Sequence, residues 1–248
     1  MTIQHYFHGK HILISGSSSG IGQSLAQYLH QYAEKIYICG RNKSKLESLS
    51  KEFPKFVPLA FDINDKEKCF ESLNKIKKLD ILIANAGTCE YINPPEFDSA
   101  IFERIIQTNF LGTVYLLESL LPLLRASKAG HFVSISSSVS FLPLPRAHAY
   151  GASKAALNYL TDTMRLSDAN DKVAFTSIYP GFIKTPLTDK NDFKMPFIIS
   201  SDEAARRMSK AIAKKKLEYH FPKKLTMTFK LIGCLPLALQ VYILKRYF

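Results

Sequence analysis

Tyr150 and Lys154 are the two side chains whose types and spacing best suit acid–base chemistry. Residues four apart lie one turn apart on the same face of a helix. A phenol has a pKa of about 10 and exchanges protons efficiently near neutral pH only if this falls by about three units, or about 4 kcal/mol. An ammonium about 4 Å away, at an effective dielectric constant near 20, supplies about that much. The pair predicts a tyrosine that moves a proton at a substrate oxygen.

The bare Tyr-x-x-x-Lys spacing is weak evidence, because it also occurs at Tyr6/Lys10 and Tyr219/Lys223. Context separates the three pairs. Only Tyr150 opens a long helical segment, A-Y-G-A-S-K-A-A-L-N-Y-L, directly after a buried strand and a serine cluster. A serine hydroxyl beside the reacting oxygen would stabilise alkoxide character as hydride moves. We interpret His148 as a surface loop histidine, not as a general base.

Three glycines, Gly16, Gly20 and Gly22, stand between an apolar run and a helical segment, in S-G-S-S-S-G-I-G at 15–22. Glycines let the backbone turn sharply and approach a pyrophosphate, whose charge meets free N–H groups at the helix N-terminus. The spacing G-x-x-x-G-x-G is also compatible with a flexible loop. With a strand before it and a helix after it, the motif favours dinucleotide binding.

Two polar side chains at the ends of the next expected strands favour NADP(H), with NAD(H) as the second candidate. Arg41 stands where NAD sites usually carry an acidic residue for the ribose 2′-hydroxyl, and an Arg there pairs with the 2′-phosphate of NADP. Asp62, followed by Ile63, is placed to accept a hydrogen bond from an adenine amino group. An exposed surface Arg and a turn Asp are the respective alternatives.

The elements that position these residues alternate between strands and helices. Continuous apolar runs predict strands buried on both faces. Strand–helix alternation predicts an α/β fold, a Rossmann-like, doubly wound parallel sheet in a single domain. The expected strands are His11–Ser15, Lys35–Cys39, Phe56–Phe61, Leu79–Ala84, His131–Ser136 and Val173–Tyr179, and the expected helices are Ile21–Tyr32, Lys43–Phe53, Lys66–Lys78, Asp98–Ala126 and Tyr150–Ser167.

From residue 10 to about residue 200 the sequence resembles the short-chain dehydrogenase/reductase family, of the NADP-preferring type. The resemblance rests on several motifs in the family's order and spacing. They are S-G-S-S-S-G-I-G at 15–22, A-N-A-G at 84–87, T-N-F-L-G at 108–112, S-I-S-S-S at 134–138, Y-G-A-S-K at 150–154 and Y-P-G-F-I-K-T at 179–185.

The resemblance implies four catalytic residues. Tyr150 would be the acid/base, Lys154 would bind the nicotinamide ribose and lower the tyrosine pKa, and Asn109 would support a water relay. The family's serine lies thirteen residues before the tyrosine, at Ser137, with Ser136 and Ser138 as neighbouring rivals.

The same resemblance and the glycine motif together imply a cofactor-binding set, in which Asn85 also supports the central sheet and Thr185 holds the carboxamide. Ser15 replaces a more common threonine, and Ser19 stands where many NADP-dependent members carry a base, so the NADP preference rests mainly on Arg41. The set is Gly16, Ser17, Ser19, Gly20, Ile21, Gly22, Arg41, Asp62, Ile63, Asn85, Ala86, Gly87, Tyr150, Lys154, Pro180, Gly181, Ile183 and Thr185.

The segment between Gly181 and Ser200 occupies the position of the family's substrate lid. Its apolar side chains either cover an apolar substrate or pack the lid onto the fold, and we hypothesise a bulky or lipid-like alcohol or ketone. These side chains are Phe193, Met195, Phe197, Ile198 and Ile199.

The formal charge of +12 is concentrated at the C-terminal end. Residues 1–203 carry 22 basic and 20 acidic side chains, whereas residues 204–248 carry 11 basic side chains and one acidic, Glu218. We therefore distinguish an oxidoreductase core, 1–203, from a basic, apolar C-terminal part, 204–248, that would complete the fold. A helix over Ala204–Lys216 and an edge strand at Tyr219–Phe221 are expected within it.

Residues 222–248 combine apolar anchors and bases without an acid, which suits attachment to an anionic membrane surface. Packing on the protein or at a subunit contact is the alternative, and no nucleic-acid recognition motif is present. The stretch Leu231–Leu244, interrupted by Pro236, is too short to span a bilayer.

The four cysteines lack metal-ligand or disulfide spacing, and no secretion signal is visible at the N-terminus. We expect no metal, a cytoplasmic location with peripheral attachment to the inner face of a membrane as a further hypothesis, and a homo-oligomer by family resemblance. The leading function is NAD(P)-dependent interconversion of a secondary alcohol and a carbonyl, on a small-molecule substrate. The alternative is a dinucleotide-sensing binding protein without catalysis.

Overall fold

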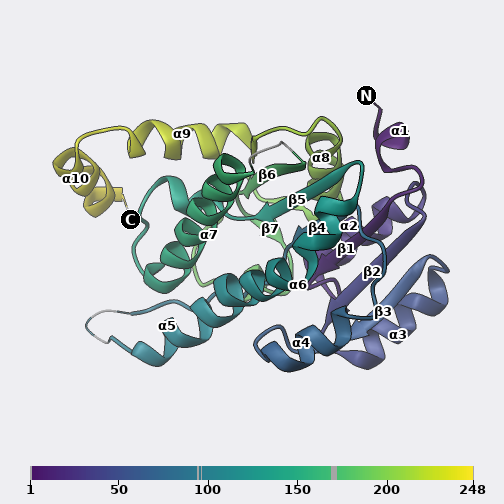
Figure 1. The fold of residues 1–248 in the computed structure, drawn as a ribbon. Helices are drawn as coiled ribbons and strands as arrows, with labels where there is room; N and C mark the ends of the chain where they lie inside the picture. The colour runs from purple at the N-terminus through teal and green to yellow at the C-terminus, as the bar shows by residue number, and fades with distance from the viewer. Residues whose placement is uncertain (1, 94, 96, 169–171, 248) are drawn as a thin grey trace.

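The strands of the chain form one parallel sheet with helices on both faces, in a computed structural model that describes residues 2–93, 95, 97–168 and 172–247 (Figure 1). The strand order is β3-β2-β1-β4-β5-β6-β9. The expected α/β, Rossmann-like, single-domain fold is confirmed. The strands are β1 His11–Ser15, β2 Lys35–Gly40, β3 Phe56–Ala60, β4 Ile81–Ala84, β5 Gly130–Ile135, β6 Val173–Pro180 and β9 Glu218–Phe221, with a separate pair, β7 Ile183–Lys184 and β8 Ile199–Ser200.

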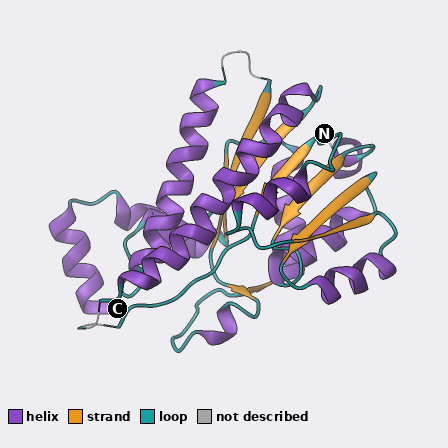
Figure 2. Cartoon of the chain, turned by 60° about the horizontal axis from the view of Figure 1, so that its bottom comes forward, coloured by secondary structure: helices purple, strands orange, loops and turns teal. Residues whose placement is uncertain are grey.

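Successive residues of each strand face opposite sides of the sheet and enter two different cores. Figure 2 shows helices on both faces of the sheet. Ile12 and Ile14 of β1 pack on one side, whereas Leu13 packs on the other. Helices α2 (Gly20–His30), α3 (Lys43–Glu52) and α8 (Ser201–Ala213) cover the first side. Helices α4 (Lys66–Leu73), α6 (Gly112–Ala126) and α7 (His148–Ser167) cover the second. Burial on both faces explains why the strands are continuous apolar runs.

The order of the strands reverses between β1 and β4, which pair in parallel from Ile12 with Ile81 to Ile14 with Ile83. From β1 the chain runs outward through β2 and β3, and from β4 it runs the other way. In such sheets ligands bind beyond the carboxyl ends of the strands at this reversal. The glycine turn follows β1, so the topology places it at the expected position.

The segment predicted as one helix, Asp98–Ala126, is three pieces. Helix α5 (Ser99–Ile106) ends in a π-helical segment, η1 (Gln107–Leu111), which leads into α6. Asp98 caps α5 by accepting the N–H of Ala100. The break falls among weak helix formers, Thr108, Asn109 and Gly112, but such residues do not by themselves predict an extra residue in the helical turn.

Residues 204–221 are integrated into the sheet layers. The composition change after Glu203 falls inside α8, whose buried face packs on α2 through Ala204, Met208 and Ile212. The expected edge strand is present as β9, which pairs with β6. Beyond it the chain forms α9 (Lys223–Gly233) and α10 (Leu237–Tyr247), and a short helix, α1 (Ile3–Phe7), precedes β1. Within the described residues, no helix is both long and apolar enough to cross a membrane.

Candidate active site

The turn after β1 brings the start of α2 to the wall of a cavity of about 600 Å³. Gly16 and Gly20 have positive φ angles of 66° and 55°, which side chains disfavour. At Gly22 a Cβ atom would lie 2.4 Å from the carbonyl oxygen of Gly16, so the helix packs directly on the turn. The three glycines are therefore required by the shape of this turn.

Helix α2 begins without a side-chain cap, although the cap residue, Ser19, is of a type that often provides one. Helices α3, α4 and α8, by contrast, are capped by Asn42, Asp65 and Ser200. The first N–H groups of α2 thus face the cavity with no side-chain acceptor. Such an end suits the negative charge of a pyrophosphate, so the residues present fit a dinucleotide.

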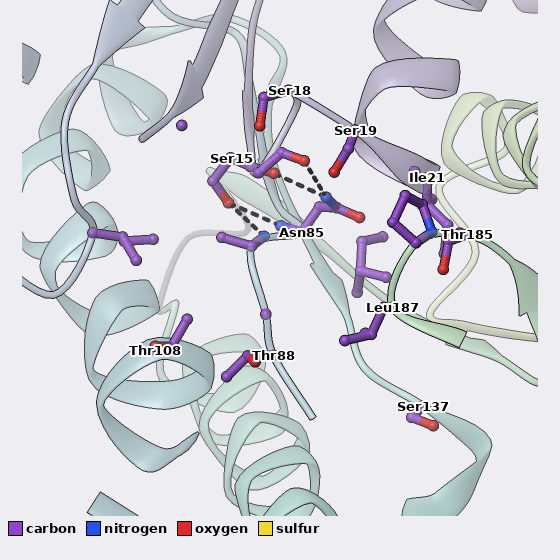
Figure 3. Close-up of a pocket in the computed structure, with 18 of the residues that line it drawn as sticks. Ser15, Ser18, Ser19, Ile21, Asn85, Thr88, Thr108, Ser137, Thr185 and Leu187 are labelled. Atoms are coloured by element: carbon purple, nitrogen blue, oxygen red, sulfur yellow. Dashed lines mark hydrogen bonds between the residues drawn. The ribbon is translucent and has the colours of Figure 1, made fainter. Parts of the chain in front are cut away.

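Ser15 joins the end of β1 to the end of β4 (Figure 3). Its Oγ accepts the backbone N–H groups of Asn85 and Ala86, both at 3.0 Å. The Asn85 amide donates in return to the carbonyl oxygens of Ser15, at 2.9 Å, and Gly16, at 3.2 Å. These four bonds hold the glycine turn and the A-N-A-G motif together as one floor of the cavity.

The far end of the cavity is lined by the residues that follow β2 and β3. Arg41 is exposed at its rim. Ser18 lies beside Gly40, where a Cβ atom would be 3.2 Å from the Ser18 Oγ. Asp62 accepts the backbone N–H of Asn64 at 3.0 Å, which fixes the turn after β3. A guanidinium and a serine hydroxyl therefore border the same end of the cavity.

Lys154 is buried, with 4% of its surface exposed, and its Nζ donates to the Ile135 carbonyl oxygen at 2.9 Å. Burial lowers the pKa of its ammonium to about 8. The Nζ lies 5.8 Å from the centre of the Tyr150 ring. The two side chains share one face of α7, as their spacing predicts.

The Tyr150 pKa differs from the sequence-based expectation. Burial raises the pKa of the phenol above its usual value, and the nearby Cys89 adds to the increase, whereas the Ser137 hydroxyl acts in the opposite direction. In the chain alone, desolvation therefore outweighs any lowering by the Lys154 ammonium. The reason is that the same burial disfavours both charged forms, the phenolate and the ammonium.

The three clustered serines have different surroundings. Ser137 lines the cavity, and its Oγ accepts the N–H of Val139 at 3.2 Å. Ser136 also lines the cavity, but its hydroxyl donates to the Lys154 carbonyl oxygen at 3.3 Å. Ser138 is buried and begins the 3₁₀ segment η2 (Ser138–Phe141). The geometry favours Ser137 as the hydroxyl beside Tyr150.

Asn109 lies in the π-helical segment behind the cavity wall and is fully buried. Its side chain accepts the N–H of Thr88 at 2.7 Å and donates to the Thr88 carbonyl oxygen and the Ser153 Oγ, both at 2.9 Å. Ser153 donates in turn to the Tyr150 carbonyl oxygen at 2.7 Å. Asn109 therefore ties the loop after β4 to the helix that carries Tyr150.

The segment that follows β6 forms the wall of the cavity opposite to the glycine turn. The N–H of Gly181 donates to the Phe221 carbonyl oxygen at 2.7 Å, which anchors the segment to β9. Thr185 approaches the glycine turn, because a Cβ atom on Gly20 would lie 3.3 Å from its side chain. The segment thus meets the start of α2 across the cavity.

The cavity brings together most of the residues that the sequence singles out, and the other two Tyr-x-x-x-Lys pairs are not among those that line it. Tyr6, for example, is buried and bonded to His131 Nδ1 at 2.6 Å. His148 begins α7 as an exposed residue, not a loop residue. The expected residues that line the cavity are Gly16, Ser19, Gly20, Ile21, Arg41, Asp62, Ile63, Asn85, Ala86, Gly87, Ser137, Tyr150, Lys154, Pro180, Gly181, Ile183 and Thr185.

Three expected residues do not line the cavity. They are Ser17, Gly22 and Asn109, and each supports the wall from behind. The Ser17 hydroxyl, for instance, donates to the Ile14 carbonyl oxygen at 2.9 Å. Sequence reasoning missed several lining residues. Ser18 lies within the S-G-S-S-S-G-I-G motif and Thr88 directly follows A-N-A-G, so the positions of these two residues carried a signal. The others include Asn64, Glu90, Arg104, Thr108, Leu187, Thr188 and Lys190.

Comparison with known proteins gives consistent matches. The family model described as short chain dehydrogenase matches residues 10–195. The chain is 32% identical over 232 residues to an uncharacterized oxidoreductase of Myxococcus xanthus, which covers 90% of this chain and 92% of that protein. It is 32% identical over 183 residues to the 3-oxoacyl-(acyl-carrier-protein) reductase of Rickettsia conorii, with 73% and 76% covered.

Two solved structures share the fold over nearly the whole chain. A short chain dehydrogenase from Burkholderia cenocepacia, in complex with NADP, has a TM-score of 0.86 at 24% identity and covers 98% of this chain and 99% of its own. A short chain dehydrogenase/reductase from Burkholderia phymatum, in complex with NAD, has a TM-score of 0.82 at 19% identity, with 91% and 93% covered.

Replacing Ser15 by Ala should destabilise the protein by about 1–3 kcal/mol, because two partly buried N–H groups lose their acceptor. Ser15→Thr keeps the hydroxyl and should cost less than about 1 kcal/mol. Denaturant unfolding of the two variants measures the difference. Equal losses in both would contradict the bonding role of the hydroxyl.

Proposed function

The chain belongs to the short-chain dehydrogenase family, and we propose that it is an NADP(H)-preferring oxidoreductase that interconverts a secondary alcohol and a carbonyl by hydride transfer. The observation that carries the proposal is one cavity lined by the uncapped start of α2 and by Ser137, Tyr150 and Lys154. A binding protein that only senses a dinucleotide is not favoured, since it has no need of this acid–base set.

In the reductive direction Tyr150 donates its phenolic proton to the carbonyl oxygen, and Ser137 donates a hydrogen bond to the same oxygen. Lys154 remains largely protonated at neutral pH, since the pKa of its ammonium is about 8, and it stabilises the phenolate left behind. When bound, the dinucleotide supplies or accepts the hydride, and its oxidised ring adds a positive charge. Asn109 acts as a positioning residue, because it holds the loop at Thr88 and, through Ser153, the first turn of α7.

The residues that would hold the dinucleotide follow from the cavity wall. The N–H groups at the start of α2 would bind the pyrophosphate, and Asp62 would contact the adenine. Arg41, with Ser18 beside it, would pair with a 2′-phosphate, which supports the preference for NADP(H). Thr185 would hold the carboxamide.

An apolar substrate is favoured by the segment between β7 and β8. Phe193, Phe197 and Ile198 are 37%, 53% and 41% exposed. Phe193 stacks edge-on against Tyr91 at 5.5 Å and Phe182 at 5.9 Å between ring centres. We propose that this aromatic group covers a bulky or lipid-like alcohol or ketone, in a cytoplasmic enzyme that forms a homo-oligomer.

Tyr150→Phe should reduce turnover at least about 100-fold, because the proton donor is lost, while the dissociation constant for NADPH changes little. The test is steady-state turnover of a panel of aldehydes and ketones, together with NADPH binding by fluorescence. Tyr159→Phe, on the exposed side of the same helix, is the matched control. Full activity of Tyr150→Phe would exclude the proposed acid.

Arg41→Ala should raise KM for NADPH about 10- to 100-fold and leave KM for NADH nearly unchanged, because one charge-assisted contact to a phosphate is lost. Parallel assays with both cofactors measure this. Lys43→Ala, an exposed base two residues further on, should change neither value. Equal changes with both cofactors would contradict the role of Arg41.

Ketones of increasing alkyl length should show kcat/KM rising about fourfold per methylene until the site is filled, since each buried methylene contributes about 0.8 kcal/mol. Phe193→Ser should flatten this dependence, whereas Leu166→Ser, at an exposed site on α7, should not. A preference for short polar substrates would overturn the apolar assignment.

A further inference from the structure

Helices α9 and α10 lie at the end of the molecule opposite to β3 and α3 (Figure 1). One face of this pair is attached to the fold. Leu225 and Phe229 of α9 and Leu244 of α10 form a small core with Leu142. Gln240 of α10 donates to the carbonyl oxygens of Gly233 and Leu235, at 3.1 Å and 2.8 Å, which fixes the turn between the helices. The two helices are thus held in place by one side only.

The side of α9 and α10 that faces away from the fold carries large apolar side chains that are exposed to solvent. Among the described residues, thirteen large hydrophobic side chains are exposed, and six of these lie between residues 227 and 242. Such a concentration is unusual for a surface with no partner. The six are Met227 (44% exposed), Leu231 (65%), Leu237 (69%), Leu239 (47%), Val241 (41%) and Tyr242 (61%).

Exposed bases flank these apolar residues. Lys223 and Lys224 stand at the start of α9, and Lys245 and Arg246 stand in the last turn of α10. No acidic side chain follows Glu218 in the sequence, and Glu218 is bonded to Lys230 at 2.6 Å. Within the described part of the chain, the four bases form no ion pair with an acidic side chain, and Lys223 Nζ lies 3.0 Å from His220 Nε2. The surface therefore combines apolar side chains with uncompensated positive charge.

We propose that this outward side of α9 and α10 is a docking surface for an anionic lipid bilayer. Large apolar side chains enter the boundary between headgroups and acyl chains, while Lys and Arg pair with lipid phosphates. Eleven residues give each helix a length of about 16 Å, which suits helices that lie in the interface and do not cross it. A second copy of this chain carries the same positive charge at this surface, so a bilayer fits better than self-association.

Docking would place the candidate active site next to the lipid. Leu225 of α9 packs against Gly181, where a Cβ atom would lie 2.7 Å from its Cδ2, and Phe182 packs on the same small core. An apolar hollow of about 760 Å³ continues the surface between α10 and the start of α7, with Val241 on one wall and Gly151 on the other. A membrane-dissolved alcohol or ketone would then lie close to the cavity, a consequence that rests on the proposed function.

The test is flotation of the full-length protein with vesicles of phosphatidylcholine alone and of phosphatidylcholine mixed with phosphatidylglycerol. We expect binding to the anionic vesicles, weak binding to the neutral ones, and loss of binding as salt is raised. Flotation needs neither dinucleotide nor turnover, so failure of the proposed reaction would leave this result unaffected.

Two sets of variants separate the charged and apolar contributions. Reversing Lys223, Lys224, Lys245 and Arg246 to Glu should reduce binding to anionic vesicles at least about 100-fold. The matched control reverses four exposed lysines at the other end of the molecule, Lys51, Lys75, Lys77 and Lys78, and should bind nearly as wild type.

Changing Leu237, Val241 and Tyr242 to Ser should abolish flotation, whereas the same change at the exposed residues Tyr159, Leu166 and Leu217 should not. Circular dichroism and thermal unfolding establish that each variant is folded. Absence of wild-type flotation, or equal loss in the control sets, would overturn the proposal. The proposal would also be overturned if the wild-type protein bound no vesicles and formed a dimer that the Leu237, Val241 and Tyr242 to Ser variant dissociates. The surface would then join two subunits.

Discussion

The parallel pairing of β1 with β4 is the constraint on which the candidate site depends. It sets the carboxyl ends of the two strands side by side, and the hydroxyl of Ser15 then bonds both N–H groups of the opposite loop. Because β5 and β6 continue the sheet in register, the loops that carry Ser137 and Gly181 leave the same edge. Residues separated by more than a hundred positions are thereby brought to one cavity, whose floor is fixed by four hydrogen bonds between the side chains of Ser15 and Asn85 and the backbone.

Burial has opposite effects on the pKa values of the two central side chains of that cavity. It raises the pKa of Tyr150 and lowers that of Lys154 from 10.5 to about 8. A lysine whose pKa is lowered on folding holds its proton less tightly in the folded state than in the unfolded state. The resulting destabilisation of the fold is complete below pH 8, and it disappears as the pH rises past the pKa of the lysine in the unfolded chain. The shift corresponds to about 3 kcal/mol. The fold tolerates this cost, and the Ile135 carbonyl oxygen accepts a hydrogen bond from the ammonium. Shifted pKa values of this kind are typical of functional sites.

The sequence was sufficient to predict the seven strands of the main sheet and most of the cavity, because both follow from local patterns of residues, whereas the short pair β7 and β8 was not predicted. Apolar runs identify strands buried on both faces, and motifs mark the loops that follow them. The π-helical segment at Asn109 was not predictable, since its cause is tertiary: the side chain satisfies Thr88 and Ser153 at the same time. A sequence motif also does not indicate which of its residues face the cavity. Ser17 turns its hydroxyl to the Ile14 carbonyl oxygen, whereas the neighbouring Ser18, which carries no motif role, lines the wall.

Seven of the eleven bases after residue 203 fall into two groups once the fold is known. Arg206 and Arg207 share Glu203 within α8, and Lys230 is bonded to Glu218, so these bases serve local structure. Lys224, Lys245 and Arg246 are instead exposed beside apolar side chains that the fold does not cover, and Lys223, also exposed, reaches His220 Nε2 at 3.0 Å. Leu225 and Phe229, buried on the inner side of α9, would suffice to hold that helix. The composition of its outer side is therefore not explained by folding, whereas the proposed contact with a bilayer accounts for it.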